Sequence, residues 1–430
     1  MKHRSRGYLV LQAFAIFVGL LFLAAGLYLL TSLSPAQAAS AQTYAQLRLL
    51  IEALYEVDNK YVGQDQDADL IHGAIRGMVM SLDSCSSFLT PAAYQQMQAG
   101  RSDSTGEVGV ELTFKEKVLT VVAPLEGGPA WRAGIEAGDH ILKINDQVVR
   151  NLTPLEAAMR LKGKPGSTIK LQLLRNGMIK PQDVTLKLEK LSPVSLNHYI
   201  LGNAYAYLRL KYFNDHTADE LEQTLTDLAK RQPPIHGLIL DLRNTARGSL
   251  EQAIASASPF IGDSMVFYTK GRHQEDPQPY YGQGKSRLPR NIPLVVLVDE
   301  GTDRTAELLA GALHDQYPAV LLGFKTFGNG AVHKEFPLRD GSALIITVAQ
   351  CYTPNGHIIH DKGLEPDIIG VASKSSDTEE IVESLELKQH KEISDPQELL
   401  QDPLIVQAIK FLGGKPEESQ DQLAPAAKDI

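Results

Sequence analysis

Hydrophobic residues recur along this chain in three different rhythms, and each rhythm predicts a different kind of structure. Between residues 41 and 100 the spacing is helical, with apolar positions every three or four residues at Leu47, Leu50, Ile51, Leu54 and Val57. A second helix is predicted over 67–83, and Thr90-Pro91 is a start signal for a third, short one. We therefore expect a helical segment over 41–100.

Residues 101–190 show a spacing of apolar residues that is typical of β-strands. Short apolar runs separated by turns predict strands over 109–114, 118–124, 140–149 and 168–175. One helix interrupts them over 154–162, where Thr153 is a good N-cap, Pro154 takes the first helical position and Glu156 completes a capping box. Short strands and one capped helix within this length predict a compact β-rich domain.

From residue 191 to residue 371 apolar strands alternate with amphipathic helices. The strands are predicted over 204–213, 237–243, 293–298 and 319–324, and the helices over 217–231, 249–260 and 305–315. Such alternation is typical of a largely parallel sheet covered by helices. A further strand is predicted over 343–353. Residues 372–430 predict an acidic linker, an amphipathic helix over 402–412 and a disordered tail.

The first 40 residues have a composition of their own. A basic start, "MKHRSR", precedes an apolar stretch over 8–30, which is long enough to span a bilayer. Positive charge before the span predicts that the rest of the chain lies across the membrane. Ala36-Gln37-Ala38 resembles a signal-peptidase site, so a cleaved signal is the alternative to the anchor that we favour.

Charge and cysteine content exclude several classes of function. The net charge of −9 argues against nucleic acid as a partner, because phosphate binding needs a basic face. Cys85 and Cys351 form neither a disulfide framework nor a metal cluster, and we expect two lone thiols. A disulfide between them is the alternative outside the cytoplasm. The sequence has no metal motif or phosphate loop, so no cofactor is expected.

The β-rich domain carries a candidate peptide site. "GEVGVEL" over 106–112 places a glycine where backbone N–H groups can hold a carboxylate, beside a strand edge that can accept a peptide strand. "GGPAWRAGIEAGDHILKINDQVV" over 127–149 closely resembles a PDZ domain. That resemblance implies a peptide-binding groove made by Glu107, Val108, Gly109, Val110, Leu155, Ala158 and Met159. The alternative for the three helix residues is that they are simply core, and Trp131 could be a docking residue or a core filler.

Six stretches in order extend the resemblance to most of the chain. They are "LDSCSSFLTPAAY", "GLILDLRN", "IPLVVLVDEGT", "KTFGNGAV", "DGSALIITVAQCYTPNG" and "KGLEPDI". Together they resemble the carboxyl-terminal processing proteases, which are tail-specific serine peptidases. This resemblance implies a crotonase-like β/α peptidase core, with an inserted PDZ domain that takes the C-terminal tails of substrates. It also implies a bacterial envelope protein, here anchored in the inner membrane through 8–30 with its bulk in the periplasm.

The residues that carry the family's chemistry are replaced in this chain. By the resemblance, the serine nucleophile position is Arg304, the lysine base position is Asn329 and the glutamine that orients the base is His333. The first glycine of the oxyanion loop is Arg247. An arginine has no nucleophilic oxygen and an asparagine has no titratable base, so neither can do the family's chemistry. We therefore expect a pseudopeptidase with no intact catalytic residue.

Other readings remain open. Thr302 or Thr305 could serve as a relocated nucleophile, with His333 as base and Asp303 orienting it, giving an active serine-type or threonine-type peptidase. More simply, Thr302 is an N-cap, and Asp303 and Glu307 suit the first helical turn, where they could also pair with Arg304. The chain could also be an adaptor in which only the PDZ domain matters. Expected partners are C-terminal peptides of envelope proteins, an active peptidase or adaptor, and a second copy of the chain.

Overall fold

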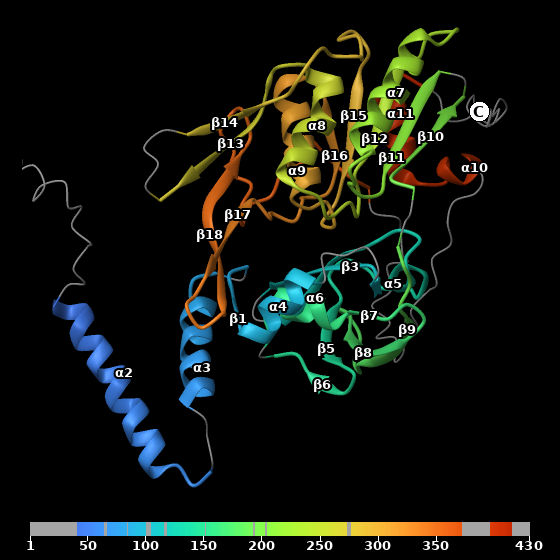
Figure 1. The fold of residues 1–430 in the computed structure, drawn as a ribbon. Coiled ribbons are helices and arrows are strands. Elements are labelled where there is room, and N and C mark those ends of the chain that lie inside the picture. Colours follow the sequence, from blue (N-terminus) through green and yellow to red (C-terminus); the bar gives the residue numbers. More distant parts are fainter. Residues whose placement is uncertain are drawn as a thin grey trace, which may run out of the picture. The chain divides into compact units, whose positions relative to one another are not determined.

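The computed structural model describes residues 41–63, 67–83, 85–99, 105–115, 118–150, 152–191, 194–202, 204–272, 277–371 and 396–414 (Figure 1). The chain divides into two compact units, residues 1–73 and 74–430. Within the described ranges no helix is both long and apolar enough to cross a membrane. The predicted span over 8–30, the acidic linker over 372–395 and the predicted disordered tail from 415 onward lie outside these ranges.

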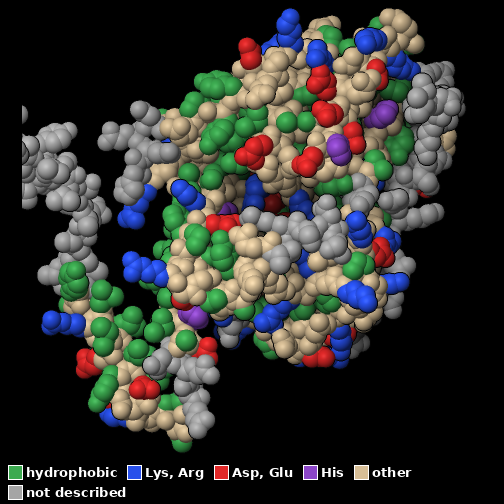
Figure 2. Space-filling model, in the orientation of Figure 1, with side chains coloured by type: hydrophobic (Ala, Val, Ile, Leu, Met, Phe, Trp, Pro, Cys, Tyr) green, Lys and Arg blue, Asp and Glu red, His purple; other side chains and the backbone are tan. Residues whose placement is uncertain are grey.

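The first unit is built on helix α2 (Ala41–Lys60), and helix α3 (Asp67–Met80) begins in it. Both helices confirm the helical spacing of the sequence. The apolar side chains of α2 are exposed, with Leu50 at 52% and Ile51 at 65% (Figure 2). The apolar spacing of this helix therefore does not mark a face that is buried among the described residues.

The β-rich domain consists of antiparallel strands around two short helices (Figure 1). The strands are β2 (Gly106–Glu107), β3 (Val110–Lys115), β4 (Val118–Pro124), β5 (His140–Ile144), β6 (Gln147–Val148), β7 (Lys162–Gly163), β8 (Thr168–Leu174) and β9 (Gln182–Lys187), and the helices are α5 (Pro129–Arg132) and α6 (Pro154–Arg160). The main sheet has the order β3-β4-β5-β8-β9. Thr153 and Glu156 form the predicted capping box of α6, with Pro154 in its first turn.

A six-stranded sheet forms the centre of the second unit. Its order is β10 (Leu196–Leu201), β11 (Tyr205–Leu210), β12 (Gly237–Asp241), β15 (Leu294–Val298), β16 (Val320–Gly323) and β19 (Ile368–Ile369). Strand β10 pairs antiparallel with β11, and the other neighbours are parallel. The predicted largely parallel sheet is therefore confirmed.

Helices cover both faces of this sheet, as its fully buried strands require. Leu238 and Leu240 of β12 belong to the core with α7 (Thr217–Lys230), α8 (Leu250–Ile261) and α9 (Thr305–Gln316). Ile239, between them, belongs to the core with α10 (Pro396–Leu399) and α11 (Pro403–Phe411). Alternate side chains thus tie one strand to two helical layers.

A second sheet lies beside the first and was only partly predicted. It contains β1 (Ser87–Leu89), β13 (Met265–Gly271), β14 (Gln278–Tyr281), β17 (Ala331–Pro337) and β18 (Ala343–Tyr352). Strand β1 pairs with β18 just before helix α4 (Pro91–Ala99), so the segment over 41–100 is not purely helical. Three residues are too few to show a strand rhythm, and the pairing partner lies far away in the sequence.

Candidate functional site

The candidate site is a sharp turn between a buried strand and a helix. All five residues of β15 are buried, and a turn of six residues, 299–304, separates β15 from α9. Arg304, the last residue of this turn, has φ 39° and ψ −95°. Non-glycine residues rarely adopt positive φ, and such strain is typical of turns that present a reacting group.

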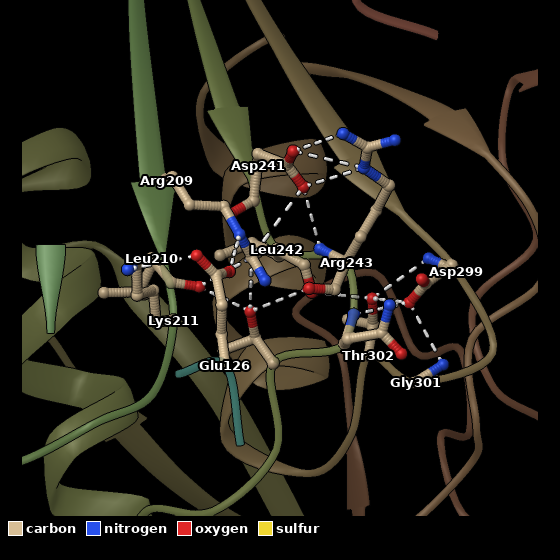
Figure 3. A network of polar contacts seen from close by, with 12 residues as sticks. Glu126, Arg209, Leu210, Lys211, Asp241, Leu242, Arg243, Asp299, Gly301 and Thr302 are labelled. Atoms are coloured by element: carbon tan, nitrogen blue, oxygen red, sulfur yellow. Dashed lines mark hydrogen bonds and ion pairs between the residues drawn. The ribbon is translucent and has the colours of Figure 1, made fainter. Parts of the chain in front are cut away.

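Hydrogen bonds from neighbouring loops hold the turn in place (Figure 3). One carboxylate oxygen of Asp299 accepts the backbone N–H of Asn244 at 2.8 Å and that of Gly301 at 3.0 Å. Thr302 donates its hydroxyl to the carbonyl of Leu242 at 2.9 Å. The prediction that Thr302 caps the helix is therefore wrong, because α9 begins at Thr305 and the intervening turn directs the Thr302 side chain to the loop after β12.

An ionic network connects this loop to the β-rich domain (Figure 3). Arg243 pairs with Asp241 at 2.6 Å, and these two charges hold each other in a buried position. Arg209 pairs with Glu126 of the β-rich domain at 2.9 Å, and Lys211 pairs with the same carboxylate at 3.0 Å. The two cations lower the pKa of Glu126 although its burial opposes this. Sequence reasoning missed this network, because it joins segments that are far apart along the chain.

Glu307 holds the loop after β16 against the first turn of α9. One of its oxygens accepts the hydroxyl of Thr326 and the N–H of Gly328, the latter at 2.7 Å. The other accepts the N–H groups of Asn329 at 2.9 Å and Arg304 at 3.0 Å. Burial raises the pKa of Glu307, but all four lone pairs accept hydrogen bonds and leave no place for a proton. We therefore treat Glu307 as ionised.

Asp303 is the neighbouring carboxyl group and has fewer partners. It is 1% exposed, one oxygen lies 3.4 Å from the amide nitrogen of Asn329, and the other has no partner. Burial raises the pKa of Asp303 to about 7. Glu307 accepts four hydrogen bonds, which favour its ionised form, whereas the Asp303 side chain has a single long contact. We therefore place the proton of this pair on Asp303. The described contacts include no ion pair between Asp303 and Arg304, which had been one expectation.

The three predicted degenerate positions gather around this pair. The amide of Asn329, the base position, contacts Asp303, the residue before Arg304. Burial and the charge of Arg304 together lower the pKa of His333 to about 4, so the imidazole is neutral at pH 7. Nine buried side-chain polar atoms in the described ranges lack a partner, and four of them belong to Asp303, Arg304, Asn329 and His333. Arg304, Asn329 and His333 thus each keep a buried polar atom without a partner.

The hydroxyls proposed for a relocated nucleophile are used elsewhere. Thr302 and Thr305 are both 0% exposed, and Thr305 donates to the carbonyl of Ser249 at 3.3 Å. No hydrogen bond between described residues joins either threonine to His333. Lys325, the nearest lysine in sequence to the base position, pairs with Glu365 at 2.6 Å on the surface.

Arg247, at the oxyanion-loop position, reaches the β-rich domain. Its guanidinium donates to both carboxylate oxygens of Glu107 at 2.8 Å and lies 3.6 Å from Glu111. Arg247 has φ 75°, a conformation that suits the glycine expected there. The ion pair lowers the pKa of Glu107 against the effect of its burial. The unusual arginine at a glycine position was the only signal in the sequence for this contact.

The residues predicted for a peptide groove lie in α6 and in the segment from β2 to the start of β3. Leu155, Ala158 and Met159 of α6 are half-buried, whereas Ala157 is fully buried in the domain core. In the described residues, the backbone N–H groups of Val108 and Gly109 donate no hydrogen bond, and Gly109 has φ 75°. Val110 begins strand β3 directly after them. Turned-out N–H groups beside a strand can hold a carboxylate, although Glu107 itself is already held by Arg247.

Two further predicted residues have a defined place. Trp131 is half-buried and lines a cavity of about 390 Å³ together with Arg209 and Arg243, so it is not a core filler. No disulfide joins Cys85 to Cys351 in the structure. Burial raises the pKa of the Cys351 thiol to about 12.

Comparison with known proteins places both domains. Residues 204–369 match the model of peptidase family S41, and residues 106–188 match that of the PDZ domain. The chain is 32% identical to the carboxy-terminal-processing protease of Bartonella bacilliformis, over 76% of this chain and 75% of that protein. It is 35% identical to the carboxyl-terminal-processing protease of Synechocystis sp., over 72% and 73%.

A solved structure has a similar fold. The photosystem II D1 C-terminal processing protease is 27% identical to this chain, with a TM-score of 0.64 over 75% of this chain and 92% of that one. The chain therefore has the mixed α/β multidomain fold of that protease, with its PDZ domain.

Proposed function

Because the chain belongs to the carboxy-terminal processing proteases of peptidase family S41, we propose that it binds protein tails without cleaving them. The observation that carries this proposal is the pair of replacements at Arg304 and Asn329, in a turn whose supporting hydrogen bonds are intact. Losing either member of a nucleophile–base pair commonly removes a factor of about 10⁵ or more from the rate. The buried, carbonyl-bound threonines support the same conclusion, because they offer no activated hydroxyl.

The PDZ domain supplies the binding part of the proposal. A peptide that extends the sheet at β3 would point its C-terminal carboxylate at the N–H groups of Val108 and Gly109. Its side chains would then meet the half-buried apolar residues of α6, namely Leu155, Ala158 and Met159. This geometry favours tails that end in hydrophobic residues.

The proposed place of action is the bacterial envelope. The apolar stretch over 8–30 would anchor the chain in the inner membrane, with the domains in the periplasm. Such a protein would hold the tails of envelope proteins as a regulator or scaffold. An active peptidase, an adaptor or a second copy of the chain would be its protein partner.

Two measurements on one purified protein test this proposal. A fluorescent peptide with a hydrophobic free C-terminus should bind, and Ala158→Trp, which fills the groove, should weaken binding at least about tenfold. The matched control Ala218→Trp, on helix α7 of the core, should leave binding unchanged. An unstructured protein with the same tail should remain uncleaved. Cleavage that Thr302→Ala or Thr305→Ala abolishes would instead establish a peptidase with relocated residues, and no binding at all would refute the proposal.

A further inference from the structure

Arg304 differs from the other half-buried arginines of the described residues in having no partner. Five of them form ion pairs with carboxylates, namely Arg76, Arg175, Arg209, Arg243 and Arg247. Arg231 donates to the carbonyl of Pro233. The side chain of Arg304 makes no hydrogen bond or ion pair with any described residue, and its Nε is buried and unsatisfied.

An unpaired guanidinium in this position is costly. It cannot lose its proton in a protein, so it cannot become neutral to escape the cost of burial. The strained backbone of Arg304 adds a further cost. An anion of matching shape would supply the missing partner.

The groups around Arg304 leave its charge uncompensated. Burial favours the protonated form of Asp303 by raising its pKa, and His333 is neutral, for the reasons given above. The carboxylate of Glu307 already accepts hydrogen bonds from four donors. None of these three groups forms an ion pair with Arg304 in the described contacts.

Groups around Arg304 also keep buried polar atoms without a partner. The free oxygen of Asp303, the Oδ1 of Asn329 and the Nε2 of His333 all lack partners. Asp303 and Asn329 are only 1% and 7% exposed, so these atoms are not merely surface groups awaiting bulk water. A protonated carboxyl and an imidazole can each donate to an anion that Arg304 binds.

The position of Arg304 identifies the anion. In a serine peptidase the nucleophile bonds to the carbonyl carbon of the cleaved residue, and hydrolysis leaves that carbon as a carboxylate at the same place. A guanidinium at this position could donate two parallel N–H···O hydrogen bonds to this carboxylate. We propose that the former nucleophile site is a receptor for the α-carboxylate at the end of a peptide, with Arg304 as its charged contact.

This inference rests on the proposed function, because a site that holds product ends must not cleave. The Arg304 site would be complementary to the end of a chain that has already been cut, rather than to an intact chain. The chain would then have two places for a carboxylate, the Val108–Gly109 loop of the PDZ domain and the Arg304 site. The two can be separated by substitution.

The test uses the full-length chain in detergent and one hydrophobic peptide, made with either a free or an amidated C-terminus. In the Ala158→Trp background, which removes the PDZ groove, the free acid should bind about tenfold or more tightly than the amide. Arg304→Gln should abolish this preference, and Arg304→Lys should retain part of it. The matched control Arg339→Gln changes an exposed arginine and should leave the preference intact.

Each alternative result is informative. If the Ala158→Trp protein binds both peptides equally or not at all while the parent chain binds tails, the inference fails and the proposed function stands. If the parent chain binds neither peptide, both fail. Inorganic phosphate that competes as well as acetate would show a general anion site and overturn the assignment to a carboxylate. A Nε–H resonance of Arg304 that shifts with the free acid and not with the amide would support it even if Arg304→Gln proved unstable.

Discussion

The candidate site has two layers with opposite hydrogen-bonding states. The supporting layer, made of Asp299, Thr302 and Glu307, is buried and well supplied with donors and acceptors. Arg304, Asn329 and His333, the positions that the resemblance assigns to the reaction, keep unpartnered polar atoms. The contrast teaches that the turn is maintained by residues that do no chemistry.

On the proposed function, this separation would explain how the fold survives a loss of activity. A group that touches only substrate contributes little to folding, so its replacement is not opposed by stability. A group that satisfies several buried N–H donors cannot be replaced without leaving them unpaired. The predictions below measure the two layers against each other.

The largest expected effect is that of removing Glu307. Glu307→Ala would leave the buried N–H groups of Gly328, Asn329 and Arg304 without an acceptor, and each should cost about 1–3 kcal/mol. The free energy of unfolding of the core, measured by urea denaturation, should fall by at least about 3 kcal/mol. The control Glu365→Ala removes an exposed carboxylate and should change it by less than about 0.5 kcal/mol. A loss below about 1 kcal/mol for Glu307→Ala would contradict a supporting role.

An effect of intermediate size on the free energy of unfolding is expected when the pH changes. The folded protein raises the pKa of Asp303 from 3.8 to about 7, so the native state binds this proton more tightly than the unfolded chain does. The contribution of Asp303 to the free energy of unfolding is therefore complete below about pH 4. It falls as the pH rises towards 7, by about 1.4 kcal/mol per unit of difference between the folded and unfolded pKa values.

The variant Asp303→Asn should flatten this part of the stability profile, because an amide does not titrate. Urea denaturation of the parent and the variant between pH 4 and pH 8 provides the measurement. Identical slopes in the two proteins would mean that Asp303 is ionised in the folded state, and the assignment of the proton would be wrong.

The smallest effect on stability is expected at the nucleophile position. Arg304→Ser removes an unpaired guanidinium, so the free energy of unfolding should not fall and should rise by no more than about 1 kcal/mol. Arg243→Ser is the matched comparison, because it breaks the buried pair with Asp241 and should cost about 3 kcal/mol or more. Equal losses in the two variants would erase the distinction between the layers.

The sequence predicted the parts of the fold that depend on the spacing of residues within one helix or strand. Thr153, Pro154 and Glu156 fix the start of α6 within four residues, and the structure confirms them. The same local reasoning failed at Thr302, because the preferred partner of its hydroxyl is a carbonyl sixty residues earlier in the chain. Strand β1 was missed for a similar reason, since its partner β18 is far away.

The candidate site was predicted by position but not by contact. Resemblance located Arg304, Asn329, His333 and Arg247, and the structure brings the first three together around Asp303. It could not indicate that Arg247 pairs with Glu107, which is 140 residues away and belongs to another domain. Nor could it indicate that Glu307, which suits a helix start, also holds the loop of Asn329. Ionic partners across domains leave no periodic signal.

The central claim is that this chain keeps the peptidase turn but not the reaction. The most direct measurement is mass spectrometry of an unstructured reporter protein with a hydrophobic tail, incubated with the parent chain and with the double variant Arg304→Ser/Asn329→Lys. We predict no cleavage by the parent chain above the rate without protein, while the double variant, which restores nucleophile and base to an intact turn, gains measurable cleavage near the tail. Cleavage by the parent chain that Thr302→Ala or Thr305→Ala abolishes would contradict the account.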